Sequence, residues 1–334
     1  MNFSREMTAV IKGCAIVFMI LLHVFGGSGW YDVDLPMNHN EELIRFMGSL
    51  QICVGIFVFM IGYGYAFSKK KDFLYSFTHI KKLLTAFWMV LFLLAVPACD
   101  ESMWGGGKEL ILNMFGVSES LCWVSWFVFL YIWAMIVMPF FGRLVDRRPY
   151  LYTVVLSALS YVALIVIHGL VPEFGTKPLW HTLWVCFMWT PLILIGYLCA
   201  RKRLVEKINF PKSLWVAIVA ILIIFAVLFA KSRFAGINIL NFDILYAPIV
   251  ILCILTIFSC WEMPWLRKVM MELGDKSVYM WFVHALFLSA ATRGVYARFI
   301  LISDNLWLIG LWTIVLSYAV SWGLMRLGSE ETRK

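Results

Sequence analysis

The chain of 334 residues is 62% hydrophobic and only 14% charged, and its mean hydropathy is +0.85. Soluble domains carry about 45–50% apolar and about 25% charged residues. The composition therefore excludes an ordinary soluble enzyme, a secreted disulfide scaffold and a disordered chain. The net charge of +8 does not require nucleic acid as a partner, because basic residues of membrane proteins first set topology.

Long apolar runs separated by short polar joints follow one another from end to end, and each is long enough for a membrane-spanning helix. We predict an all-α polytopic membrane protein, because the runs are continuously apolar rather than alternating as in a β-barrel. We expect a single domain over residues 1–334 with no appended soluble domain. The ten predicted spans are Thr8–Phe25, Leu43–Phe67, Leu83–Ala98, Leu121–Phe141, Tyr150–Leu170, Trp180–Ala200, Leu214–Ala230, Leu240–Cys260, Ser277–Thr292 and Leu306–Met325.

The basic residues provide an independent test of this topology. With the N-terminus in the cytoplasm, 21 of the 28 Lys and Arg residues fall in inner segments. This bias alternates correctly across the ten spans, as the positive-inside rule requires. The sequence therefore predicts that both termini are cytoplasmic and that the first run is a span rather than a cleaved signal peptide.

The first span carries three ionisable residues on one face. Arg5, Lys12 and His23 are 7 and 11 residues apart, and 18 residues make five whole helical turns. Lys12 is expected near the cytoplasmic boundary and His23 about 16 Å further along the axis. Such a stripe suits an anionic co-substrate that enters from the cytoplasm and meets a base. The alternative is a topological anchor plus one histidine bonded to a neighbouring helix.

The same span resembles the opening of the membrane-bound acyltransferase-3 family, in which a basic residue, ten residues and a histidine follow one another as Lys12 and His23 do here. Further stretches resemble later helices of that family in order, and together they cover nearly the whole chain. These stretches are Gly55–Tyr63, Trp126-Phe127 with Pro139, Pro191–Tyr197 and Leu273–His284.

The resemblance implies transfer of an acyl group, usually acetyl from acetyl-coenzyme A, to a hydroxyl of a cell-surface or lipid-linked carbohydrate. It implies that His23 is the catalytic residue, and a neutral imidazole can take a proton from an attacking hydroxyl. Direct transfer and a transient acyl-enzyme both stay open, and so does a succinyl donor. The expected location is the plasma or inner membrane, with membrane lipid around the chain, no metal and no nucleic acid.

Coenzyme A carries phosphates, and Arg5, Lys12, Lys81 and Lys82 are the candidate residues that bind them. The family often has an Arg-x-x-Arg pair at the start of the third helix, whereas this chain has His79 and Lys82 at those positions. A lysine binds phosphate as a point charge, and a histidine is a poorer phosphate ligand than arginine. The alternative role for Lys81 and Lys82 is attraction to anionic lipid.

His284 lies about eight residues into the ninth predicted span and is the second catalytic candidate, with Trp281 on the same face. It would act as an acid–base group or orient the acceptor; the alternative is a buried histidine that bonds a neighbouring helix. Four charged residues on the outer side are candidate acceptor contacts, although most of them also fit solvated loop charge. They are Glu41, Glu42, Arg45 and Asp243.

A second function class also fits ten helices with buried charge, namely a transporter or exporter of a polysaccharide or lipid-linked precursor. Internal repeats would favour it, and none is clear in the sequence. A transporter also has no need of a cation-to-histidine stripe on one helix face. Cys99 and Cys122 flank one outer joint and could pair in an oxidising compartment.

Overall fold

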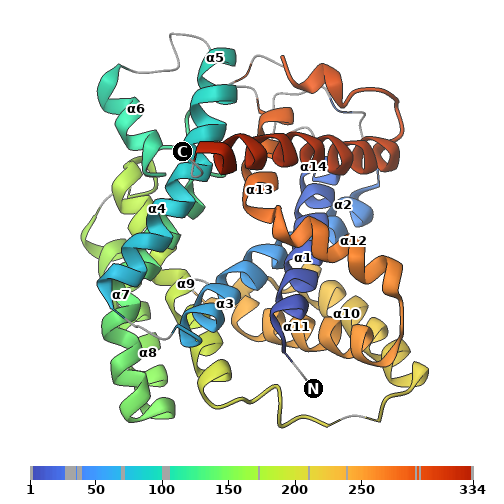
Figure 1. Ribbon diagram of the computed structural model, residues 1–334. Coiled ribbons are helices and arrows are strands. Elements are labelled where there is room, and N and C mark those ends of the chain that lie inside the picture. Colours follow the sequence, from blue (N-terminus) through green and yellow to red (C-terminus); the bar gives the residue numbers. More distant parts are fainter. Residues whose placement is uncertain are drawn as a thin grey trace.

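The computed structural model describes residues 3–26, 35, 40–68, 72–99, 106–171, 174–209, 211–237, 240–289, 292 and 295–331. Within them the protein is a bundle of helices with one two-residue antiparallel ladder (Figure 1). The helices are α1 (Arg5–Phe25), α2 (Glu41–Gly48), α3 (Ile52–Ala66), α4 (Phe73–Val90), α5 (Val96–Ala98), α6 (Gly107–Met114), α7 (Trp126–Arg147), α8 (Pro149–Leu170), α9 (Pro178–Arg201), α10 (Leu214–Arg233), α11 (Asp243–Cys260), α12 (Pro264–Asp275), α13 (Ser277–Phe287) and α14 (Leu306–Glu331). The strands are β1 (Gly236–Ile237) and β2 (Leu240–Asn241).

Nine helical segments among the described residues are long and apolar enough to cross a membrane. Helix α13 is apolar but has only 11 residues, too few to span the hydrocarbon layer alone, so the predicted ninth span is shorter than Ser277–Thr292 among the described residues. The prediction of an all-α polytopic membrane protein is therefore confirmed. The two least regular spans are composite, because the second joins α2 and α3 through a 3-10 turn and the third joins α4 and α5 through a π-helical segment, Leu91–Ala95. Pro97 follows this segment and has no N–H to donate, which accounts for a local change of helix type.

Several span boundaries differ from the predicted ones. In two of them a polar residue caps the helix outside the apolar run and sets its first residue. The third span starts at Phe73, ten residues before the predicted Leu83, because Asp72 accepts a hydrogen bond from Tyr75 N at 2.9 Å. Ser4 caps α1 in the same way. In contrast, the fourth span begins only at Trp126 rather than at Leu121.

Helix α12 was not predicted, and it packs closely along α1. A Cβ atom on Gly13 would clash with the carbonyl of Met270, and one on Gly274 would clash with the carbonyl of Ala9. Glycines let two helix backbones approach closely. The contact also includes an exposed ion pair between Arg267 and Glu6 at 3.1 Å.

Helix α1 lies near the middle of the bundle, with α3, α11, α12, α13 and α14 around it (Figure 1). Helices α4, α7 and α8 lie along one side of the molecule, and α10 lies on the other. The face of α1 that carries His23 is therefore enclosed by other helices. This position makes α1 the axis of the candidate site.

Candidate active site

Two histidines from distant parts of the chain meet in the interior. His23, near the end of α1, is 7% exposed, and His284 of α13 is fully buried. Their rings stack with centroids 5.3 Å apart and an interplanar angle of 21°. The indole of Trp123 makes T-shaped contacts with both imidazoles, with ring centroids 4.5 Å from His23 and 6.2 Å from His284. The two catalytic candidates of the sequence thus form one cluster with an indole.

Two indole hydrogen bonds hold the segment before α7 against α13. The Nε1 of Trp123 donates to the carbonyl of Ala285 at 3.2 Å, and the Nε1 of Trp281 donates to the carbonyl of Val124 at 3.3 Å. A buried indole N–H normally requires such an acceptor. The two hydrogen bonds hold Trp123 beside the histidines and place Trp281 near them.

The tautomer of His284 follows from its hydrogen bond. Its Nδ1 lies 2.9 Å from the carbonyl oxygen of Met280, and a carbonyl only accepts, so Nδ1 carries the proton. The Nε2 atom is then an acceptor. It is buried and has no hydrogen-bond partner among the described residues. His284 can therefore accept a proton or a hydrogen bond from a ligand in the site.

A cavity of about 350 Å³ opens beside His23, and we call it the histidine cavity. Three tryptophans line it, and Glu119 and Gln51 add polar groups. The tryptophans are Trp123, Trp126 and Trp281. Its volume suits a small reacting group rather than a whole coenzyme.

A second cavity, of about 680 Å³, lies toward the start of α1, and we call it the basic cavity. Arg5 and Lys12 line it from α1, and His79 and Lys82 line it from α4. Tyrosines supply additional polar groups on its walls, and Asp275 adds one carboxylate. Three of the four phosphate candidates, Arg5, Lys12 and Lys82, therefore share one cavity. Lys81 is exposed and does not line it.

Three aromatic rings separate the two cavities, and we call them the aromatic barrier. Phe57 and Phe127 line the basic cavity, whereas Trp281 lines the histidine cavity. The ring of Trp281 lies 5.1 Å from that of Phe57 and 4.3 Å from that of Phe127. A void of only about 30 Å³ is lined by the three rings together with neighbouring side chains of α4 and α13. The barrier limits the passage between the cavities to a narrow apolar gap.

The acceptor contacts predicted on the outer side do not meet the histidines. Glu41, Glu42 and Arg45 are exposed and line neither cavity. Glu42 instead pairs with Arg233 at 2.5 Å and with Arg45 at 3.4 Å. Their exposure agrees with the alternative of solvated charge.

Asp243 is buried at the start of α11 and accepts a hydrogen bond from Lys231 Nζ at 2.6 Å. This ion pair ties α11 to the end of α10, and removing either partner would leave a buried charge. Cys99 and Cys122, which flank the outer joint, both carry free thiols.

Sequence reasoning missed three residues beside His23, namely Trp123, Glu119 and Gln51. Glu119 and Trp123 belong to the joint before α7, where no helical period assigns a side chain to a face. Gln51 sits in the 3-10 turn between α2 and α3, which shifts the helical register. Glu119, a polar residue in a predicted joint next to an apolar run, carries a weak signal in the sequence, whereas Gln51 and Trp123 fell inside the predicted spans Leu43–Phe67 and Leu121–Phe141.

Together these features define a polytopic membrane protein with a buried histidine centre and a separate basic cavity along the same helix. The acyltransferase domain of the acyltransferase-3 family matches residues 9–326, nearly the whole chain, so the protein belongs to this family. It is therefore an acyltransferase, as the resemblance indicated. Neither a curated protein nor a solved structure matches the chain.

Proposed function

We propose that the protein is an O-acyltransferase of the plasma or inner membrane that moves an acetyl group from acetyl-coenzyme A to a hydroxyl of a cell-surface or lipid-linked carbohydrate. The observation that carries this proposal is the arrangement along α1, with a basic cavity at one end and a histidine pair at the other. Lys12 and His23 are 11 residues apart, which corresponds to about 16 Å of helix. An extended pantetheine arm can span this distance.

In this proposal the phosphates of the coenzyme lie beside Arg5, Lys12 and Lys82, on the cytoplasmic side. Charge-assisted contacts to phosphate are the strongest hydrogen bonds that such side chains form. The pantetheine arm passes the aromatic barrier, and the thioester carbonyl reaches the histidine cavity. The barrier keeps water from the thioester until the arm fills the gap.

The chemistry requires one base and no metal. Nε2 or Nδ1 of His23 takes the proton of the acceptor hydroxyl, and the oxygen attacks the thioester carbonyl. The carbon–sulfur bond then breaks, and the leaving thiolate receives the proton from the imidazolium. The products are an O-acetyl ester and coenzyme A. His284, whose Nε2 is an acceptor, stabilises the imidazolium or orients the hydroxyl.

The test uses the purified full-length protein in lipid nanodiscs, with His23→Ala beside the wild type. We expect both proteins to bind acetyl-coenzyme A with the same dissociation constant. We expect the variant to lose acetyl transfer by roughly 10²- to 10⁴-fold, the usual contribution of a general base. Alkali-released acetate from surface glycans of cells that express each protein gives the second readout.

Two outcomes would overturn the proposal. Equal transfer by the wild type and the His23→Ala variant would remove His23 from the reaction. A wild-type protein that binds no acyl-coenzyme A but moves a lipid-linked glycan across the membrane would establish the transporter function instead.

A further inference from the structure

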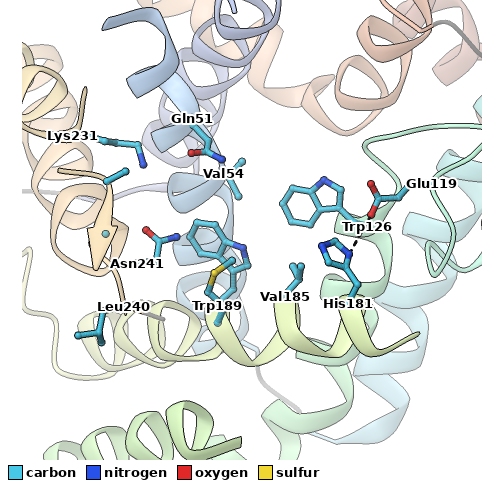
Figure 2. Close-up of a pocket in the computed structure, with 13 residues that line it drawn as sticks. Gln51, Val54, Glu119, Trp126, His181, Val185, Trp189, Lys231, Leu240 and Asn241 are labelled. Carbon is cyan, nitrogen blue, oxygen red and sulfur yellow. Dashed lines mark ion pairs between the residues drawn. The ribbon is translucent and has the colours of Figure 1, made fainter. Parts of the chain in front are cut away.

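A third cavity, of about 540 Å³, adjoins the histidine cavity and shares no lining residue with the basic cavity. Figure 2 shows residues that line it. The two cavities share Gln51, Val54, Glu119 and Trp126 as lining residues. A molecule in the third cavity can therefore reach His23 without passing the aromatic barrier. Neither Glu41, Glu42 nor Arg45 lines it.

The walls of this cavity combine flat aromatic surface with uncharged polar groups. Trp126 and Trp189 contribute indole rings to the lining, and Gln51 and Asn241 contribute amides. The C–H faces of a sugar ring pack on an aromatic ring, while its hydroxyls need donors and acceptors around the edge. The cavity volume lies within the range of small-molecule sites. These features favour a ring-shaped polyol.

The charge in the cavity disfavours an anionic ligand. Lys231 reaches the cavity, but its ammonium is neutralised by Asp243 at 2.6 Å. The other charged group among the described lining residues is the Glu119 carboxylate, with His181 beside it. A neutral hydroxyl-rich ligand is compatible with this balance.

Glu119 is positioned before any ligand arrives. Its carboxylate lies 3.9 Å from Nδ1 of His181, and Figure 2 shows both side chains beside Trp126. The serines on either side of it are anchored, because Ser120 Oγ accepts from Asn113 Nδ2 at 2.8 Å and the Ser118 carbonyl accepts from Ser125 Oγ at 2.9 Å. A carboxylate on such a fixed segment orients a ligand hydroxyl at low entropic cost.

We propose that the third cavity binds one sugar ring of the acceptor, with Trp189 as its stacking surface and Glu119 as the positioning residue that aims a hydroxyl at His23. This inference rests on the proposed acyl transfer at His23. It assigns the acceptor to a different set of residues from those that the sequence suggested. Glu119 accepts a hydrogen bond from one ring hydroxyl, and a neighbouring hydroxyl gives its proton to His23.

The experiment measures coenzyme A thiol release from acetyl-coenzyme A by the full-length protein in nanodiscs. The probes are methyl glycosides of common hexoses and of their N-acetylamino forms, and sorbitol is the control with hydroxyls but no ring. We expect at least one glycoside to raise thiol release and sorbitol to leave it unchanged. If no glycoside raises it while acetyl-coenzyme A still binds, the sugar site is excluded.

Variants then test the two named residues. Glu119→Gln should raise the KM for the active glycoside by about tenfold, because the amide oxygen accepts a weaker hydrogen bond than the carboxylate, and kcat should stay within twofold. Trp189→Ala should raise the same KM, and Trp189→Phe should restore most of it. Asp304→Asn, an exposed acidic residue that lines none of these cavities, is the matched control.

The outcomes separate this inference from the proposed function. If glycoside acylation depends on His23 but Glu119→Gln behaves like Asp304→Asn, the acceptor site is wrong and the acyl transfer stands. If Trp189→Phe is as impaired as Trp189→Ala, stacking is not the contribution of that residue. Thiol release that does not depend on His23 would overturn both proposals.

Discussion

The imidazole rings of His23 and His284 stack at 5.3 Å, although 260 residues separate them in the chain. The contact joins α1 to α13. Trp123, from the segment before α7, packs against both imidazole rings. Two rings at this distance can contact one ligand. In the proposed mechanism the Nε2 atom of His284 therefore lies beside the group that reacts at His23.

Replacing His284 by Phe tests this relationship, because a phenyl ring keeps the stacked shape and removes both nitrogens. We expect kcat to fall by about 10²-fold, since the reacting groups lose their alignment, while binding of acetyl-coenzyme A stays within twofold. Steady-state thiol release and equilibrium binding measure the two quantities. An unchanged kcat would show that His284 has only a packing role.

Two adjacent lysines on α4 provide a matched pair for the basic cavity. Lys82 lines the cavity and Lys81 does not. We expect Lys82→Ala to raise the KM for acetyl-coenzyme A by about tenfold, with an effect that shrinks at high salt, because a phosphate contact is lost. Lys81→Ala should change it by less than twofold. Equal effects of the two substitutions would indicate a general surface charge rather than a phosphate site.

Removing part of the aromatic barrier should allow water to hydrolyse the thioester. Phe57→Ala removes one of the three rings between the cavities and should let water reach the thioester. We expect faster hydrolysis of acetyl-coenzyme A without an acceptor, whereas Phe57→Leu, which keeps most of the volume, should stay near the wild type. Thiol release without acceptor measures this hydrolysis. No increase in Phe57→Ala would show that the barrier does not exclude water.

The crossing of α1 and α12 predicts a stability effect. Gly274→Ala forces a methyl group into the carbonyl of Ala9, and overpacking of this kind costs about 1–3 kcal/mol of unfolding free energy. Gly48→Ala is the control, because a Cβ atom there meets nothing within 4 Å. Thermal unfolding in detergent compares the two variants. A midpoint for Gly274→Ala equal to that of the control would contradict the close packing.

Glu119 predicts a pH dependence for the acceptor. Burial raises the pKa of this carboxyl, which lies outside the spanning helices, from 4.5 to about 7. The carboxylate that accepts the sugar hydroxyl is therefore present above pH 7 and is lost as the pH falls below it. We expect the KM for the active glycoside to rise between pH 8 and pH 6, and this rise should disappear in Glu119→Gln.

Neighbouring charges require a control in this titration. His181 faces Glu119 directly, and Lys231 with its partner Asp243 lies in the same cavity. His181→Gln removes the imidazole that lies beside the Glu119 carboxylate. If the pH effect persists in Glu119→Gln but vanishes in His181→Gln, the assignment of the effect to Glu119 is wrong.

Local features of the sequence were sufficient for most of the spans and for the alignment of one candidate stripe. Apolar runs identify spanning helices because the thickness of the hydrocarbon layer sets their length, and helical periodicity aligns Lys12 with His23 without any other element. The start of α4 differed because the cap at Asp72 acts independently of hydropathy. Helix α12 was missed because its packing on α1 rests on two glycines, which contribute no apolar signal.

Only the tertiary structure decided which side chains meet. The stacking of His284 on His23, the closure of the barrier by Trp281 and the position of Glu119 beside His181 all depend on contacts between helices and joints far apart in the chain. A period along one helix assigns a residue to a face but does not say which partner covers that face. The sequence therefore determined the class of protein and the helix, α1, along which the candidate site lies. The packing of the other helices against α1 decided which side chains line the cavities.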